Sequence, residues 1–256
     1  MLRNVLVILL GTVMVASAAY SPQPFQKSAA DKSLQEALSK AQSDSEKVEL
    51  AKSTWSVNPE DMQVGKTAAT IMRKYMTDAE NYFKSKADGE SIVARYLYAW
   101  YFGDTLISAK QADWILKKDP KNFWGLVLQA NSEWDKSKPD MDKVRSGFEA
   151  AVAADPSQPD GYWLLGYVFQ DLDKWQDARS AFDAGANCDP TNTDIRDGRL
   201  TVYAQMRDAD AYFNLSKAMF PADPLQMDLA FANGTDHLTP AKLLGKTTVL
   251  EFWGFS

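Results

Sequence analysis

Residues 157–190 read SQPDGYWLLGYVFQDLDKWQDARSAFDAGANCDP and decide the fold, because they contain two apolar stripes separated by a short polar turn. The apolar positions lie three or four residues apart, as expected for two amphipathic helices that pack against each other. These positions are Tyr162, Leu165, Phe169, Ala178 and Phe182. Gly166 is expected where the two helices cross, since a side chain there would separate them. Pro190 ends the unit because proline cannot continue a helix.

The same unit recurs along the chain and is marked by Asp-Pro dipeptides. They are Asp119-Pro120, Asp155-Pro156, Asp189-Pro190 and Asp223-Pro224, and their prolines lie 36, 34 and 34 residues apart. A sustained period near 34 residues is typical of a solenoid of helical hairpins, in which about three or more units stack to bury a continuous core. The sequence therefore predicts a mainly α fold.

The stretch 157–190 resembles the tetratricopeptide repeat family, whose consensus runs W-x-x-L-G-x-x-Y, then A-x-x-x-F, then P. The matching residues are Tyr162, Leu165, Gly166, Phe169, Ala178, Phe182 and Pro190. The units 121–156 and 191–224 match weakly, and 89–120 keeps little beyond helical periodicity. The resemblance implies a helical-hairpin solenoid over 58–224, with one clear repeat, two degenerate repeats and a helical N-terminal cap. The alternative is that the weak units are ordinary helical hairpins.

In such an array the first helix of each hairpin lines a groove that binds a protein or peptide partner. In this register six residues would face the groove: Trp124, Val127, Asn131, Trp134, Trp163 and Tyr167. The set is aromatic and lacks the Lys- and Asn-rich pattern of arrays that clamp a peptide carboxylate, so we do not expect that activity. Two interpretations stay open, a partner-binding surface or a stripe packed against a neighbouring domain.

The first 19 residues have the order of a secretory signal peptide. Arg3 precedes an apolar run over residues 5–15, and small residues follow at 16–19. Such a run is too short for a bilayer core of about 30 Å, which makes a membrane anchor the weaker alternative. We therefore expect residues 1–19 to be removed and the protein to be exported, to a bacterial periplasm, with no stable membrane span afterwards.

The next segment, residues 20–57, has few large apolar residues and is expected to form a polar helical or flexible arm. A helix is then expected to start at Asn58-Pro59-Glu60-Asp61, where Asn58 would be the cap and the proline would fit the first turn. One apolar stripe predicts that this helix continues to Asp88-Gly89.

After Pro224 the pattern changes from helices to short strands and turns. Asn233-Gly234 is typical of a tight hairpin turn, and residues 247–253 have the composition of a buried strand. Residues 225–256 resemble the N-terminal part of a thioredoxin-like (redoxin) domain. In that family an NG-type turn, a Leu-x-x-Leu-x-Gly-Lys stretch and a strand ending in Phe-Trp precede the redox Cys-x-x-Cys. The matching residues are Asn233-Gly234, Leu244-Gly245-Lys246, Val249-Leu250 and Phe252-Trp253.

This resemblance places the family's first redox cysteine just after Ser256, with Trp253 beside the missing motif. It implies that the full-length protein is a thiol–disulfide oxidoreductase whose repeats recruit or orient partners. Residues 1–256 lack the redox motif and are expected to have no such activity. The groove would then bind a protein or peptide partner, or the missing thioredoxin-like domain. We expect a truncated product: a fragment, an engineered boundary, or a UGA codon read as a stop, which would make the parent a selenoprotein. The alternatives are a non-enzymatic exported interaction scaffold and a fragment of a peroxiredoxin-like peroxidase.

The composition limits the remaining classes of function. The 256 residues contain one cysteine, Cys188, and one histidine, His237. This excludes an intrachain disulfide framework and makes a His-based triad or multi-His metal site hard to assemble, so we expect no metal and no cofactor. The chain has 28 Lys+Arg against 34 Asp+Glu, which argues against nucleic acid as a partner. Cys188 is expected to be a small buried hydrophobe, or else to form an intermolecular disulfide. His237 is expected in a loop.

Overall fold

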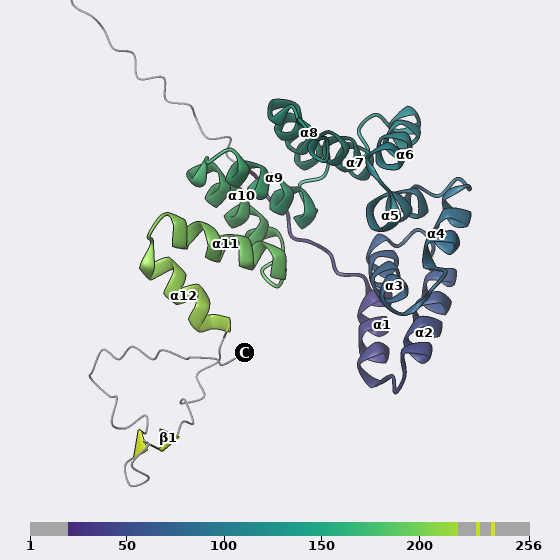
Figure 1. Ribbon diagram of the computed structural model, residues 1–256, viewed down its shortest axis with the longest axis horizontal. Helices are drawn as coiled ribbons and strands as arrows, with labels where there is room; N and C mark the ends of the chain where they lie inside the picture. Colours follow the sequence, from purple (N-terminus) through teal and green to yellow (C-terminus); the bar gives the residue numbers. More distant parts are fainter. Residues whose placement is uncertain (1–19, 220–228, 231–236, 239–256) are drawn as a thin grey trace, which may run out of the picture. The chain divides into compact units, whose positions relative to one another are not determined.

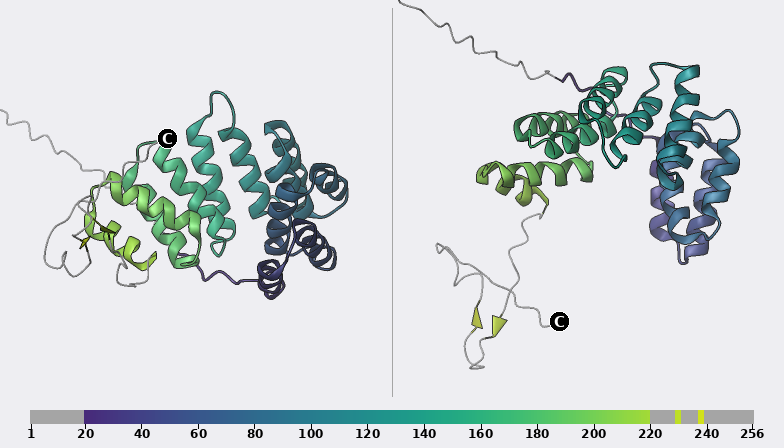
Figure 2. Two further views of the ribbon diagram at one scale, coloured as in Figure 1. Left: turned by 60° about the horizontal axis from the view of Figure 1, so that its bottom comes forward. Right: turned by 45° about the horizontal axis from the view of Figure 1, so that its top comes forward.

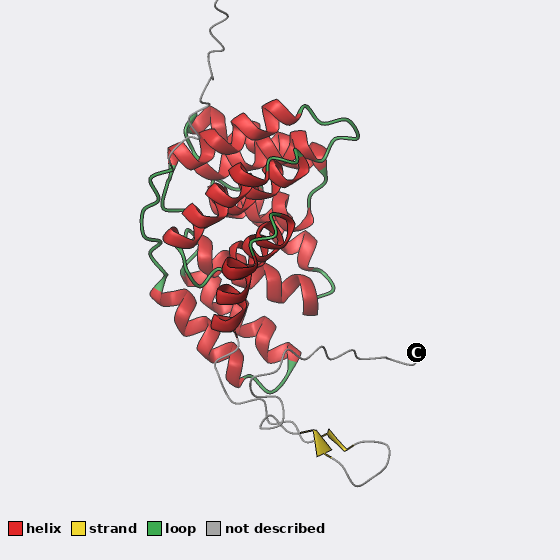
Figure 3. Cartoon of the chain, turned by 90° about the vertical axis from the view of Figure 1, so that its left-hand side faces the viewer, coloured by secondary structure: helices red, strands yellow, loops and turns green. Residues whose placement is uncertain are grey.

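The computed structural model describes residues 20–219 and the short segments 229–230 and 237–238 (Figure 1). The chain divides into two units after Met206, and each is considered by itself. The described part of the first unit consists of helices, their connections and an extended N-terminal segment (Figure 3). Its helices are α1 (Ala29–Lys40), α2 (Asp44–Val57), α3 (Met62–Tyr75), α4 (Ala79–Ala87), α5 (Ile92–Phe102), α6 (Thr105–Lys118), α7 (Phe123–Trp134), α8 (Met141–Ala154), α9 (Pro159–Asp171), α10 (Trp175–Cys188) and α11 (Thr193–Gln205).

Consecutive helices of this unit pack in hairpins, such as α7 with α8 and α9 with α10. The first helices of neighbouring hairpins also meet, since α5 contacts both α3 and α7, and α9 contacts α11. Figure 2 shows the hairpins stacked side by side along the unit. This is the arrangement of a tetratricopeptide-like helical solenoid, in which each hairpin buries its apolar face on the next. The predicted mainly α solenoid is confirmed.

The hairpin of α9 and α10 has the core that residues 157–190 predict. Tyr162, Leu165 and Phe182 are fully buried. A Cβ atom on Gly166 would lie 2.6 Å from the ring of Phe182, well inside van der Waals contact. The glycine is therefore required for the close approach of the two helices, as the sequence indicates.

The Asp-Pro dipeptides have a common structural role in the turns between hairpins. In each described turn the aspartate Oδ1 accepts a hydrogen bond from the N–H two residues later. The distances are 3.1 Å for Asp119 and Lys121, 3.0 Å for Asp155 and Ser157, and 3.0 Å for Asp189 and Thr191. Asn122 and Asn192 then cap the following helices with their side chains. The fourth dipeptide, Asp223-Pro224, lies outside the described residues.

The long helix expected from Asn58 to Gly89 is wrong, because the chain forms two helices there. Asp61 caps α3 by accepting from the N–H groups of Gln63 and Val64, whereas Asn58 lies at the end of α2. The helix stops at Tyr75, and α4 starts at Ala79. The apolar stripe continues across the break because the buried residues of both helices belong to one core. Periodicity alone therefore does not reveal the turn at residues 76–78.

The segment 20–57, expected to be a polar helical or flexible arm, contains α1 and α2. Both helices contribute to the core through Leu34, Ala51 and Trp55. The indole of Trp55 stacks on Phe83 of α4, with 4.8 Å between ring centroids. The helical stack of the first unit therefore begins at α1, ahead of residue 58. Residues 20–28, which precede α1, are extended.

In the second unit the structure describes helix α12 (Ala209–Met219) and two short strands, β1 (Leu229–Ala230) and β2 (His237–Leu238). The strands pair in antiparallel register, with Ala230 opposite His237. His237 thus lies in a strand rather than in the expected loop. The expected signal peptide at 1–19, most of the thioredoxin-like segment 225–256 and Trp253 lie outside the described residues. None of the described helices has the length and apolar character needed to cross a membrane.

Candidate functional site

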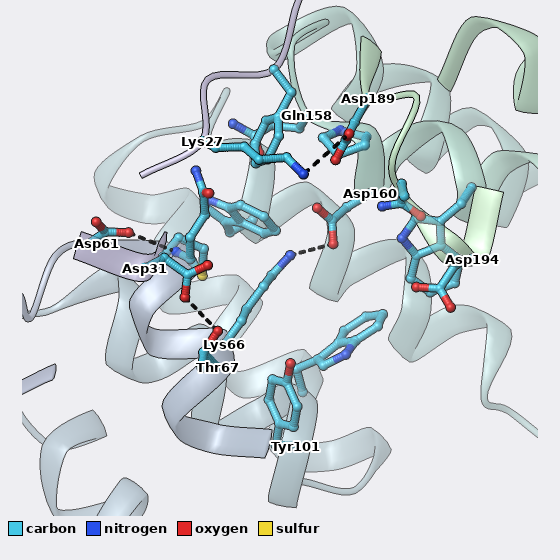
Figure 4. A pocket seen from close by; sticks show the side chains of 18 residues that line it. Lys27, Asp31, Asp61, Lys66, Thr67, Tyr101, Gln158, Asp160, Asp189 and Asp194 are labelled. Atoms are coloured by element: carbon cyan, nitrogen blue, oxygen red, sulfur yellow. Dashed lines mark hydrogen bonds and ion pairs between the residues drawn. The ribbon is translucent and has the colours of Figure 1, made fainter. Parts of the chain in front are cut away.

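A groove of about 580 Å³ lies between the first helices of the hairpins (Figure 4). Its walls come from α3, α5, α7, α9 and the start of α11, together with α1 and the extended residues before it. We call residues 20–28 the N-terminal strap. The groove therefore brings together segments that are more than 160 residues apart, from Phe25 to Asp194.

The groove has a set of aromatic side chains contributed by successive first helices. Its aromatic lining residues are Phe25, Trp100, Tyr101, Trp124 and Trp163. Trp100 meets Trp163 edge-on, with ring centroids 6.4 Å apart. Trp124 contacts Tyr96, a core residue of α5, with 4.6 Å between the ring centroids. The tryptophans are half-buried: they pack against the core and remain partly accessible from the groove.

An ion pair crosses the groove from α3 to α9. The Lys66 ammonium bonds the carboxylate of Asp160, and in Figure 4 these two side chains point toward each other. The same ammonium lies 4.4 Å from the ring centroid of Trp124, a favourable cation–π position. Both side chains of the pair are less than a quarter exposed, at 23% and 17%. The pair therefore joins distant hairpins in a partly dry environment, where water screens the attraction less than at an open surface.

Carboxylates outnumber ammonium groups in the groove. Its charged lining residues are Asp31, Asp61, Asp160, Asp189, Asp194, Lys27 and Lys66. Both lysines already contact acids, Lys66 at Asp160 and Lys27 at Asp189 with 3.7 Å between the charged atoms. The groove consequently keeps a negative potential after these pairs form.

Asp194 differs from the other carboxylates of the groove. Burial, and then the neighbouring charges of Asp160 and Asp197, raise the pKa of Asp194 above its usual range. The charge of Lys66 acts in the opposite direction on this pKa but does not cancel the rise. A cation placed beside the carboxylate would relieve the repulsion from the other acids, so this position favours a positively charged ligand.

The six residues that the sequence assigns to the groove are found in different surroundings. Trp124 and Trp163 line it. Val127 is 0% exposed and belongs to the core, because α7 turns that position toward its neighbouring helices. The other three are held by near neighbours. Asn131 donates to Asp135 at 2.8 Å, Trp134 Nε1 donates to Asp171 at 3.0 Å, and Tyr167 lies edge-on to Phe182 at 5.3 Å.

The sequence gives no direct signal for several residues that complete the groove. Trp100 and Tyr101 lie at the end of α5, in the unit 89–120 that matches the repeat only by periodicity. Lys66 and Asp160 are 94 residues apart, and their pairing depends on how the hairpins stack. Lys27 comes from the segment expected to be an arm.

Cys188 is buried at the end of α10, as the sequence predicts for a small core residue. Its thiol donates to the carbonyl of Ser157, with Sγ 2.9 Å from the oxygen. Burial and the nearby charges of Asp189 and Asp155 raise the pKa of Cys188 from 9.0 to about 11. The thiol is therefore protonated and shielded at neutral pH, which disfavours an intermolecular disulfide. Among residues 20–219 no cluster of three or more His, Cys, Asp or Glu side chains has the arrangement of a metal site.

No protein-family model matches the chain, and no curated protein matches it in sequence. Solved structures do share its fold. A chain of the crystal structure of the APC/C hetero-tetramer Cut9–Hcn1 aligns with a TM-score of 0.51 and 14% identity. The alignment covers 71% of this chain and only 38% of that one.

Two other solved structures align over most of their own length. PilW, described as a widely conserved type IV pilus biogenesis factor, aligns with a TM-score of 0.49 and 14% identity, over 78% of this chain and 97% of that one. TTC0263, described as a thermophilic TPR protein in Thermus thermophilus, aligns with a TM-score of 0.41 and 12% identity, over 76% and 93%. The stacked hairpins give the chain a tetratricopeptide-like helical-repeat fold, in agreement with the Cut9–Hcn1 alignment.

Proposed function

We propose that this chain is a protein-interaction scaffold whose groove binds an extended partner segment with a lysine or arginine close to an aromatic or apolar residue. The observation that carries the proposal is the combination of half-buried tryptophans and excess carboxylates in one cavity. The tryptophans favour apolar and cationic side chains through packing and cation–π contacts. The carboxylates favour cationic side chains.

The size of the groove supports a peptide segment as the ligand. A volume of about 580 Å³ accommodates a few side chains. The groove follows several first helices of the stack, and an extended segment would contact several of them at once. The acidic side chains lie on opposite walls, so a basic side chain in the middle would be attracted from both sides.

The proposal is tested by measuring the fluorescence anisotropy of labelled nine-residue peptides mixed with the full chain. Peptides with an aromatic residue two positions before a lysine are expected to bind, and the same peptides with glutamate for lysine are expected to bind at least about tenfold more weakly. Trp163→Leu should weaken binding of the basic peptides by about tenfold, as expected for a central aromatic contact. Trp114→Leu on α6 is the matched control, because that tryptophan is also half-buried but does not line the groove. Equal binding of basic and acidic peptides would contradict the proposal.

We further propose that the scaffold is exported and that its full-length form is a thioredoxin-like thiol–disulfide oxidoreductase. The support is sequence alone: the order of charged, apolar and small residues over 1–19, and the motifs Leu244-Gly245-Lys246 and Phe252-Trp253. Mass spectrometry of the protein from its native cell tests export, since removal of the first 18 or 19 residues is expected. Sequencing of the coding DNA after the Ser256 codon tests the second proposal, which requires Cys-x-x-Cys or its selenocysteine equivalent. An extended protein with that motif should reduce insulin disulfides.

A further inference from the structure

The N-terminal strap has a sequence suited to an extended conformation. It contains Pro22 and Pro24, on either side of Gln23. Proline fixes its own φ and disfavours the helical region for the preceding residue, so Ser21 and Gln23 are restricted to extended conformations. The strap therefore loses less conformational entropy on docking than an ordinary segment would.

The strap binds the turns of the array through alternate backbone groups. The N–H of Gln23 donates to the carbonyl of Pro156 at 3.1 Å, and the N–H of Phe25 donates to the carbonyl of Cys188 at 3.0 Å. Pro22 and Pro24 have no N–H to donate. The strap therefore forms backbone hydrogen bonds as an added edge strand does, with its donors directed to the array at positions 23 and 25.

Side chains position the rest of the strap along the groove. Phe25 and Lys27 line the cavity, and the Lys27 ammonium bonds Thr191 and lies 3.7 Å from Asp189. Gln63 of α3 holds the other end, because its amide donates to the carbonyl of Gln26 at 2.8 Å and accepts from the N–H of Ser28 at 3.0 Å. The strap thus extends from the α9–α10 hairpin to α3, and Figure 1 shows this connection crossing between them.

We infer that the strap is an intramolecular ligand of the groove, and that a partner binds by replacing it. The inference rests on the proposed function and specifies the partner as an extended segment with an aromatic residue at one position and lysine or arginine two positions later. Phe25 and Lys27 have this spacing, with the ring forming part of the cavity wall and the ammonium beside Asp189. The carbonyls of Pro156 and Cys188 would accept the partner's N–H groups in the same way.

The contacts of the strap are suited to exchange. Two partly buried rings pack the strap against the array, Phe25 and Tyr20, the latter edge-on to Tyr162 with 5.8 Å between ring centroids. The other contacts are two backbone hydrogen bonds and polar contacts of side chains. The Lys27 side chain is 45% exposed. Because the strap is tethered, it competes with a free peptide at an effective concentration on the order of millimolar. A free peptide should therefore bind the wild-type chain more weakly than it binds a chain whose strap is weakened.

The test uses the strap sequence as its own probe. A labelled peptide of residues 20–28, acetylated and amidated at its ends, is titrated with the full wild-type chain and with the full chain carrying Phe25→Ala and Lys27→Glu. The double variant should bind the probe at least about tenfold more tightly than wild type, because its own strap no longer competes well. Lys32→Glu together with Tyr75→Ala is a control with similar changes outside the strap, and it should bind as wild type does. Equal affinity of wild type and the double variant, with both folded by circular dichroism, would overturn the inference.

A second probe separates backbone recognition from side-chain attraction. The same peptide with an N-methyl group on Phe25 keeps every side chain but loses the donor to the Cys188 carbonyl. It should bind the double variant about tenfold more weakly than the unmodified probe. Undiminished binding of the methylated peptide would show that the probe does not form the hydrogen bond to the Cys188 carbonyl.

Hydrogen exchange of the wild-type chain gives an independent measurement. The amides of Gln23 and Phe25 should exchange at least about a hundredfold faster than those in the middle of α9, because the strap opens without unfolding the array. Exchange of these two amides only with global unfolding would make the strap a permanent part of the core and overturn the inference. If the double variant and wild type bind basic peptides equally well, the proposed function stands and only this inference fails. If the strap probe binds and no external peptide does, the proposed function fails instead.

Discussion

The α9–α10 hairpin and the crossing between α3 and α9 hold the same unit together by different means. In the hairpin the Phe182 ring lies against Gly166, and the surrounding side chains are fully buried. At the crossing the link is the ion pair of Lys66 and Asp160, beside a cavity. The difference indicates that apolar packing between neighbours in sequence determines the fold. Polar contacts between distant hairpins determine the width and charge of the groove.

The largest expected effect on stability is in the α9–α10 hairpin. Phe182→Ala should lower the free energy of unfolding by about 3–5 kcal/mol, because it leaves a cavity in a fully buried core. Urea unfolding followed by circular dichroism measures it. Phe213→Ala is the matched control, since that phenylalanine is 65% exposed and should change stability by less than about 0.5 kcal/mol. A small effect of Phe182→Ala would mean that the hairpin is not the stable part of the unit.

The second prediction concerns Cys188, where the hairpin and the strap meet. Its pKa is raised to about 11 in the folded protein, so the folded thiol keeps its proton after the unfolded thiol, near pH 9, has lost it. This contribution to stability is present below pH 9 and is lost as the pH rises to 11, by about 2 kcal/mol at most. Wild type and Cys188→Ala are compared by urea unfolding at pH 8 and pH 11. The variant should lose less stability between the two pH values, and an equal loss would contradict the assignment.

The third prediction concerns the ion pair between α3 and α9. Asp160→Asn should lower the free energy of unfolding by about 1 kcal/mol, an effect between those of exposed and buried ion pairs. The exchanged pair, Lys66→Asp with Asp160→Lys, should recover part of the loss. Glu90→Gln is a control, because its pair with Lys118 is more exposed and should contribute less than about 0.5 kcal/mol. An effect as large as that of Phe182→Ala would make the crossing part of the folding core.

The smallest expected effect is a pH dependence of peptide binding. Because the pKa of Asp194 is raised, its carboxylate takes up a proton at a higher pH than an ordinary aspartate does. A basic peptide prefers the ionised form, so its affinity should fall by a few-fold on acidification, starting at a higher pH than an ordinary aspartate would cause. Asp194→Asn should flatten this dependence in anisotropy titrations over a series of decreasing pH values. The exposed Asp113 of α6 provides the control, and Asp113→Asn should leave the profile unchanged.

Local features of the fold could be predicted well from the sequence. The spacing of Tyr162, Leu165 and Phe182 predicts the α9–α10 hairpin, and Gly166 marks the place where the helices meet, because both depend on residues close in the chain. The break between α3 and α4 could not be predicted, since the apolar stripe continues through it. Within the groove, Trp124 and Trp163 could be predicted from the repeat pattern, whereas Val127 was wrongly placed there and lies in the core.

The repeat and its period follow from the amino-acid sequence alone, because side-chain periodicity and Asp-Pro turns act over a few residues. Which charges share the groove depends on the tertiary packing of the hairpins. The pairing of Lys66 with Asp160, and the docking of the strap at Pro156 and Cys188, depend on the rotation of each hairpin relative to the next. That rotation accumulates over several interfaces, and no short sequence pattern specifies it.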